Sequence, residues 1–117
     1  MIRQVQGKLW GRTSPIFARN NVEIHRIEGT AGGYCSRHFH AHKHNLFFVE
    51  RGRLMIEAWA NGDEADVTEL GAGEFCTVPP GHPHRFTDHE ACVAFEVYWV
   101  ELSGEDIVRE SRGGAKT

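Results

Sequence analysis

Histidine is the residue type whose arrangement indicates chemistry in this sequence. Seven of the eight histidines fall into two short clusters, at residues 38–44 and 82–89. In the first cluster His38, His40, His42 and His44 alternate with other residues, so an extended backbone would project all four imidazoles on one face. Two neutral rings at positions i and i+2 can converge on one divalent ion, which makes a metal site the first hypothesis.

The four rings of the first cluster cannot all bind the same ion. A strand rises by about 3.3 Å per residue, so the outermost rings would stand roughly 20 Å apart, whereas a metal's first shell is about 4 Å across. One adjacent pair is therefore the ligand pair, and a third ligand must come from elsewhere. We expect it from the second cluster, which follows the turn signal Pro79-Pro80-Gly81 at the point where the chain re-enters a strand.

The segments that must position these histidines have the character of short strands. Apolar runs alternate with turn signals such as Arg51-Gly52-Arg53 and Asn61-Gly62-Asp63, at the spacing of an all-β sandwich or barrel. The expected strands lie near residues 22–27, 34–40, 46–50, 54–59, 67–70, 75–78, 85–88 and 93–100. The last of these alternates, with Phe95 on one face and Glu96 on the other. The only helical signal is at 103–109, where Ser103 can act as the N-cap of a short C-terminal turn.

Length, composition and charge exclude several classes of protein. The 117 residues, 40% hydrophobic and 25% charged, predict one globular core without a separate nucleotide-binding domain. A formal net charge of -3 provides no field for gathering nucleic acid, and no apolar run is long enough to cross a membrane. Three cysteines in no paired spacing indicate neither a disulfide framework nor a cysteine zinc site. Because no signal peptide is evident at Met1, we expect a cytoplasmic protein.

The two clusters together resemble the two sequence patterns of the cupin superfamily. The first pattern is matched by Gly32, His38, His40 and Gly52, and the second by Gly73, Pro79, Gly81 and His84, with Asp88 in place of an asparagine. The resemblance implies one cupin domain over residues 1–117, an all-β jelly-roll barrel (double-stranded β-helix). Its core would cover about residues 20–102, followed by a short C-terminal helix and tail at 103–117.

The resemblance also implies which residues hold the metal. His38, His40 and His84 would be the ligands of a divalent transition metal, with Zn, Mn, Ni, Co and Fe as the candidates. The carboxylate of the first pattern is replaced by Asn45. A neutral amide oxygen is a weaker ligand for a hard divalent ion, so we expect Asn45 to bind weakly or to lie just outside the ligands.

Position 45 also bears on the remaining histidines of the first cluster. It is five residues after His40, an odd interval, so one straight strand cannot place both side chains inside the barrel. A turn through residues 41–44 must intervene, which moves His42 and His44 to the rim.

A narrower resemblance is to the cupin domain of type II mannose-6-phosphate isomerases. It extends over about residues 8–110 and is most specific in the closing run Gly104-Glu105-Asp106-Ile107-Val108-Arg109. It implies a metal-dependent aldose–ketose isomerisation of a phosphorylated sugar, in which a proton moves between C1 and C2 through an enediolate. Lys43, Arg85 and Arg109 match positions of basic residues that would bind the phosphate. His38 departs from that family, which has a glutamine at this position.

Two other functions stay open, and no catalytic residue is predicted. Three neutral histidines with open positions resemble the site of three-histidine Fe(II) cupin dioxygenases, and a non-catalytic module that binds a small molecule is the other alternative. The partner in each case is a small-molecule ligand, neither nucleic acid nor a membrane. Small cupins often pair through edge strands, so the family implies a homodimer, for which Met1 to Gln6 offer an extra edge strand.

Overall fold

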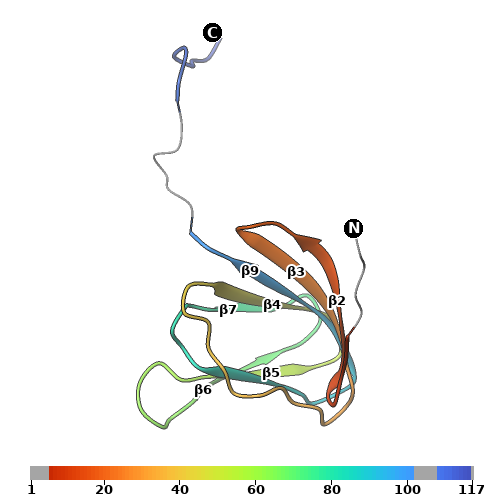
Figure 1. Ribbon diagram of the computed structural model, residues 1–117. Coiled ribbons are helices and arrows are strands. Elements are labelled where there is room, and N and C mark those ends of the chain that lie inside the picture. Colours follow the sequence, from red (N-terminus) through yellow and green to blue (C-terminus); the bar gives the residue numbers. More distant parts are fainter. Residues whose placement is uncertain (1–5, 102–107, 117) are drawn as a thin grey trace.

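The computed structural model describes residues 6–101 and 108–116, and within these ranges it contains nine β-strands and no helix. The strands are β1 (Gln6–Lys8), β2 (Gly11–Ala18), β3 (Val22–Gly29), β4 (His44–Arg51), β5 (Leu54–Ala58), β6 (Asp66–Leu70), β7 (Phe75–Val78), β8 (His84–Asp88) and β9 (Cys92–Trp99). They form two antiparallel sheets, in the orders β1-β2-β3-β9-β4-β7 and β6-β5-β8 (Figure 1). The prediction of an all-β jelly-roll fold is confirmed.

The core lies between the two sheets. Alternation along each strand turns one apolar set inward, so that Ile27 and Phe47 of the larger sheet and Leu54, Ile56 and Phe86 of the smaller one are almost completely buried. The smaller sheet lies below the larger one in Figure 1. Burial of apolar side chains from both sheets is the main stabilising contribution to such a fold.

Most of the expected strands are present, with differences of at most two residues at their ends. The expected strand at 34–40 is wrong, because this segment makes only isolated bridges, Tyr34 to Thr87 and His38 to His84. Two strands before residue 20, β1 and β2, were not expected from the sequence. They lack a clear apolar alternation, and Pro15 lies inside β2.

The two ends of the chain are only partly described. Residues 1–5, most of the expected extra edge strand, lie outside the described residues, and β1 begins at Gln6 as the edge of the larger sheet. Most of the expected helical turn, residues 103–107, also lies outside them, while Val108 and Arg109 have no regular secondary structure. Within the described residues, no helix is long and apolar enough to cross a membrane.

Two glycines of the sequence patterns occupy backbone conformations that L-residues rarely adopt. Gly52, in the β4–β5 turn, has a φ of 87°, and a Cβ there would lie 2.3 Å from the carbonyl oxygen of Ala91. Gly81, with a φ of 81°, closes the turn that leads into β8. Its amide donates a 2.8 Å hydrogen bond to the carbonyl of His40, so this turn also fixes the backbone of the histidine segment.

Candidate metal centre

Three of the predicted histidines converge at one end of the barrel. One ring nitrogen from each of His38, His40 and His84 lies within 4.8 Å of the others. The ring centroids are 4.6 Å apart for His38 and His84, 5.2 Å for His38 and His40, and 5.6 Å for His40 and His84. Nitrogens around one tetrahedral ion are about 3.3 Å apart at ordinary bond lengths, so small ring rotations bring this set onto a single ion.

Backbone hydrogen bonds hold the two histidine segments against each other. The amide of His38 donates to the carbonyl of His84 at 3.1 Å, and the amide of His84 donates back at 2.8 Å. This reciprocal pair places both side chains on the same side of the local ladder. The segment at 34–38 therefore covers the free edge of β8, although it forms no regular strand.

Further hydrogen bonds orient the rings for coordination. Nδ1 of His38 donates to the carbonyl of Ser36 at 2.7 Å, and Nδ1 of His84 donates to the carbonyl of His82 at 3.0 Å. With the proton on Nδ1, Nε2 of each ring carries the lone pair that binds a metal. Hydrogen bonds from the distal ring nitrogen to a carbonyl are the usual support of metal-binding histidines.

Unpartnered buried atoms gather at the same place. Among the described residues, four buried side-chain polar atoms lack a hydrogen-bond partner, and three of them are Nε2 of His40, Nε2 of His84 and Oδ1 of Asn45. Buried polar atoms normally have partners, so the unpartnered Nε2 atoms on two of the three converging rings leave room for a group that bonds to both. A divalent cation fits this donor set.

The protonation states of the rings favour the same interpretation. Burial, together with the neighbouring His38, lowers the pKa of His40 to about 4. Burial also lowers the pKa of His84 below its usual range. Both rings are therefore neutral near pH 7, which is the state that binds metal.

The remaining candidates of the first cluster lie around this centre. Asn45, on β4, is completely buried and is paired in register with Tyr98 of β9. Residues 41 and 42 form a bend, after which His44 begins β4. His42 is exposed, and His44 stacks on the ring of Trp99 with its Nε2 3.3 Å from a Glu101 carboxylate oxygen.

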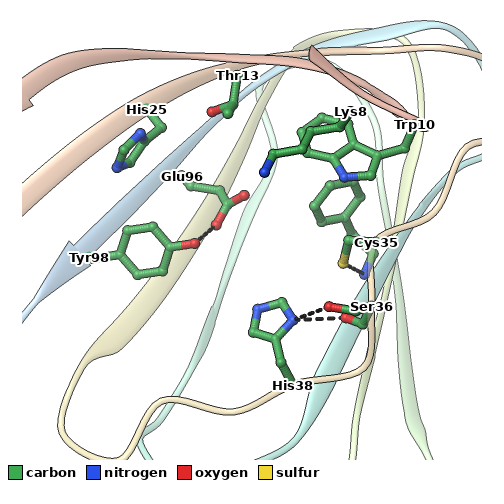
Figure 2. Close-up of a pocket in the computed structure, with 10 residues that line it drawn as sticks. Lys8, Trp10, Thr13, His25, Cys35, Ser36, His38, Glu96 and Tyr98 are labelled. Atoms are coloured by element: carbon green, nitrogen blue, oxygen red, sulfur yellow. Dashed lines mark hydrogen bonds between the residues drawn. The ribbon is translucent and has the colours of Figure 1, made fainter. Parts of the chain in front are cut away.

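A cavity of about 350 Å³ opens beside the histidines, between the ends of the two sheets (Figure 2). His38 lines it, together with residues from β1, β2, β3 and β9: Lys8, Thr13, His25, Glu96 and Tyr98. Trp10 and Phe86 close the apolar side, with their rings in an edge-to-face contact at 4.8 Å. A cavity of this size accommodates a small molecule such as a sugar.

Glu96 and Tyr98 form a polar pair on the cavity wall, and neither was expected at the site from the sequence. Tyr98 Oη donates a short hydrogen bond to Oε2 of Glu96 (Figure 2). Burial raises the pKa of the Glu96 carboxyl, and burial raises that of the Tyr98 hydroxyl as well. The signal in the sequence was a carboxylate on the inward face of an otherwise apolar strand.

Lys8 is the second cavity residue that was not predicted. Its side chain extends from β1 into the cavity, with the ammonium directed toward Glu96 (Figure 2). The sequence offered no signal for it, because β1 and β2 were not predicted.

The three basic residues predicted to bind phosphate lie outside the cavity lining. Lys43 donates to Glu23 at 2.9 Å, and Arg85 donates to Glu57 at 2.8 Å on the opposite side of β8 from the His84 ring. Arg109 is exposed in the C-terminal segment. A phosphate-binding role for these residues stays a prediction.

The fold is a small β-barrel, and the three histidines at one of its ends could hold a metal ion. The cupin domain family (Cupin_2) matches residues 26–100, which is more than half of the chain. The chain therefore belongs to the cupin family. No curated protein matches its sequence.

Solved structures agree with this assignment at the level of the fold. KdgF from Halomonas sp. matches with a TM-score of 0.72 and 13% identity, over 87% of this chain and 88% of that one. A variant of oxalate decarboxylase from Bacillus subtilis gives 0.74 and 14%, over 84% of this chain but 27% of the other. The Cnp3 cupin domain of Schizosaccharomyces pombe gives 0.70 and 14%, over 84% and 69%. At such low sequence identity, the likeness supports the fold and does not indicate the activity.

Proposed function

We propose that this cupin binds one divalent transition metal through His38, His40 and His84 and acts on a small phosphorylated sugar in the adjoining cavity. The observation that carries the proposal is the convergence of three histidine ring nitrogens beside a cavity that also presents a cation, Lys8, and a buried acid, Glu96. A structural neighbour, the oxalate decarboxylase of Bacillus subtilis, contains Mn(II) centres. The reaction proposed for this chain is an aldose–ketose isomerisation.

The metal and the carboxylate have different parts in this proposal. His38, His40 and His84 would hold a divalent ion, which would supply polarisation of a carbonyl or hydroxyl of the ligand. Glu96 then takes the proton from the adjacent carbon on Oε1, since Oε2 is occupied by the hydrogen bond from Tyr98. Glu96 returns that proton to the former carbonyl carbon, while the ligand's hydroxyl proton moves to the former carbonyl oxygen, so the isomerisation is complete without any other reactant. The raised pKa of Glu96 makes it a stronger base than an exposed glutamate.

Lys8 is the residue proposed to bind the anionic group of the ligand. It is the only lysine or arginine in the cavity lining as the described residues define it. Lys43 is the matched comparison, because the resemblance assigns it to the phosphate while its ammonium is bonded to Glu23. A neutral sugar would leave Lys8 without a counterpart other than Glu96.

The test uses untagged full-length protein loaded with Zn²⁺, Mn²⁺ or Co²⁺ and supplied with mannose 6-phosphate. We expect metal-dependent formation of the ketose phosphate. Glu96→Gln should lower kcat by about 100-fold or more while retaining the metal. Lys8→Met should raise KM, and Lys43→Met should leave it nearly unchanged.

Other results would replace the proposal. Ligand binding without turnover would indicate a non-catalytic binding module, detectable as ligand-induced stabilisation. Oxygen consumption that depends on Fe(II) would indicate the dioxygenase. A KM that rises for Lys43→Met and not for Lys8→Met would place the phosphate at the rim instead of in the cavity.

A further inference from the structure

Two arginines converge on one tryptophan next to the candidate metal centre. The guanidinium carbon of Arg37 lies 3.9 Å from the centroid of the Trp59 ring, and that of Arg85 lies 5.9 Å from it. Both distances are within the roughly 6 Å at which a cation is attracted to an aromatic face. Arg37 directly precedes His38, and Arg85 directly follows His84. The arginine–tryptophan cluster therefore involves the same two segments of chain as the metal centre.

Backbone alternation places the arginines and the histidines on opposite sides of these segments. His84 is buried on the inner side of β8, so Arg85 beside it projects outward, as does its cross-strand partner Glu57. The reciprocal bridge between His38 and His84 puts their rings on one side, and Arg37 therefore faces the other side. The imidazoles point into the barrel, and the guanidiniums meet outside it.

Trp59 is buried without belonging to the core between the sheets. It follows the last residue of β5, and only 7% of its surface is exposed. The core cluster of the described residues does not include it. Its indole Nε1 donates a 3.3 Å hydrogen bond to the carbonyl of Asp63, which fixes the ring beneath the two guanidiniums. Trp59 thus offers a held aromatic surface to the histidine segments.

Trp59 contacts both segments that carry the proposed ligands. Its amide donates a 2.8 Å hydrogen bond to the carbonyl of Pro83, the residue before His84. Its ring meets Arg37, the residue before His38. One residue at the end of β5 therefore restrains the chain immediately before each of the two ligands.

Arg37 is the member of the cluster that depends most on this contact. Arg85 already donates two hydrogen bonds to Oε1 of Glu57, at 3.0 and 2.8 Å. Among the described residues Arg37 makes no ion pair, and its side chain is exposed except where it stacks on Trp59. Substitution of Arg37 therefore removes the stack and leaves the core intact.

The segment that carries His38 needs such a restraint because it forms no regular strand and makes only isolated bridges. Ligands that are already held in place bind more tightly than ligands that must first be ordered. We propose that the stack of Arg37 on Trp59 fixes the spacing of His38 and His84, so that both are positioning residues of the metal centre. The proposal rests on the metal binding in the proposed function.

The first test is isothermal titration of the full chain with Zn²⁺. Arg37→Ala should weaken binding by about fivefold, the size expected of an exposed cation–π contact. Arg37→Lys keeps a cation for the ring and should recover most of the affinity. Arg19→Ala is the matched control, because Arg19 lies 5.1 Å from the centroid of Phe17 in a contact that involves neither histidine segment. It should leave the affinity unchanged.

A double-mutant cycle shows whether Arg37 and Trp59 act together. Trp59→Leu removes the aromatic face, keeps an apolar side chain and should weaken Zn²⁺ binding about as much as Arg37→Ala. The two substitutions combined should weaken it little further, because the stack is lost in either one. Arg37→Ala keeps the test valid if Trp59→Leu does not fold, since Arg37 is exposed.

Hydrogen exchange of the metal-free protein provides a second readout. The amides of His38 and His84 form the reciprocal bridge between the two segments. Both should exchange about fivefold faster in Arg37→Ala, while the amides of β9 should keep their rates. NMR measures both sets in one sample.

Two kinds of failure are distinguishable. A wild type that binds no Zn²⁺ contradicts the metal function itself, and with it the positioning role. A wild type and an Arg37→Ala variant that bind Zn²⁺ equally tightly contradict the positioning role alone, and so does unchanged exchange of the His38 and His84 amides. A loss of affinity in Arg19→Ala equal to that in Arg37→Ala would also contradict it.

Discussion

Two regions of the barrel contain buried polar atoms without partners, and they differ in their surroundings. At the candidate metal centre, two such atoms are Nε2 of His40 and Nε2 of His84, whose rings converge with that of the cavity residue His38, and a third is Oδ1 of Asn45. The other region contains a single one, Oδ2 of Asp88. That carboxyl is completely buried, accepts one hydrogen bond from the Cys92 thiol at 3.1 Å, and lies against Gly29 so closely that a Cβ there would be 2.3 Å from Oδ1.

The difference separates two meanings of an unsatisfied buried group. Several acceptors that converge beside an open space can be satisfied together by a ligand that enters the space. A single carboxyl that is sealed on all sides has no such ligand and simply lowers the stability of the fold. Removing a polar group should therefore abolish binding in the first region and increase stability in the second.

The largest expected effect is the loss of metal binding in His84→Ala. Removal of a supporting hydrogen bond around a metal costs 10- to 100-fold in affinity in other sites, so loss of a ligand nitrogen should exceed about 100-fold. His44→Ala is the matched control, because His44 stacks on Trp99 away from the three converging nitrogens. Isothermal titration with Zn²⁺ measures both variants. Equal losses of affinity would contradict the choice of ligands.

The sealed region should respond in the opposite direction to substitution. Burial raises the pKa of Asp88 from its ordinary 3.8 to about 6. Between about pH 3.8 and 6, Asp88 therefore keeps its proton in the folded protein but has lost it in the unfolded chain. The contribution of Asp88 to the free energy of unfolding falls as the pH rises through this window. Above pH 6 the full penalty of the buried charge is present.

Asp88→Asn removes that penalty with little change of shape. It should raise the free energy of unfolding by about 2 kcal/mol at pH 7.5 and by much less near pH 4. Urea denaturation at the two pH values measures the change, with the exposed Asp66→Asn on β6 as the control. A gain that does not depend on pH, or a loss of stability at pH 7.5, would show that Asp88 has a partner in solution.

The smallest expected effect concerns position 45. The buried Oδ1 of Asn45 either faces the bound metal or, like Asp88, has no ligand. If Oδ1 of Asn45 faces the bound metal, Asn45→Glu supplies an anionic ligand and should tighten binding by about tenfold. Competition with a chelator is sensitive enough to detect this change. An unchanged affinity would place residue 45 outside the metal's ligands.

The parts of the molecule that depend on local patterns were predictable from the sequence. Seven strands follow from apolar alternation and turn signals, and the resemblance to the two cupin patterns pointed to His38, His40 and His84, which the structure brings together. Gly81 shows why this works, since its turn connects directly to the backbone of His40. A pattern that sets backbone geometry within a few residues can be recognised without knowing the rest of the fold.

The rest of the candidate site depends on pairings between distant residues. Lys8 and Trp10 reach the cavity only because β1 and β2 add to the edge of the larger sheet, and their polar sequences give no alternation to predict it. Alternation places Glu96 on the opposite face of its strand from Phe95, but it does not say which of the two faces is inward or that part of it borders a cavity. The segment at 34–40 has the alternation of a strand, yet alternation does not determine whether an extended segment is paired.

The metal content of the untagged protein shows whether His38, His40 and His84 form a metal site. Protein purified without chelator is analysed by inductively coupled plasma mass spectrometry beside the double variant His38→Ala/His84→Ala. We expect close to one equivalent of a divalent transition metal in the wild type and none in the variant. A wild type that contains no metal and does not bind added metal, or a variant that binds as much, would contradict it.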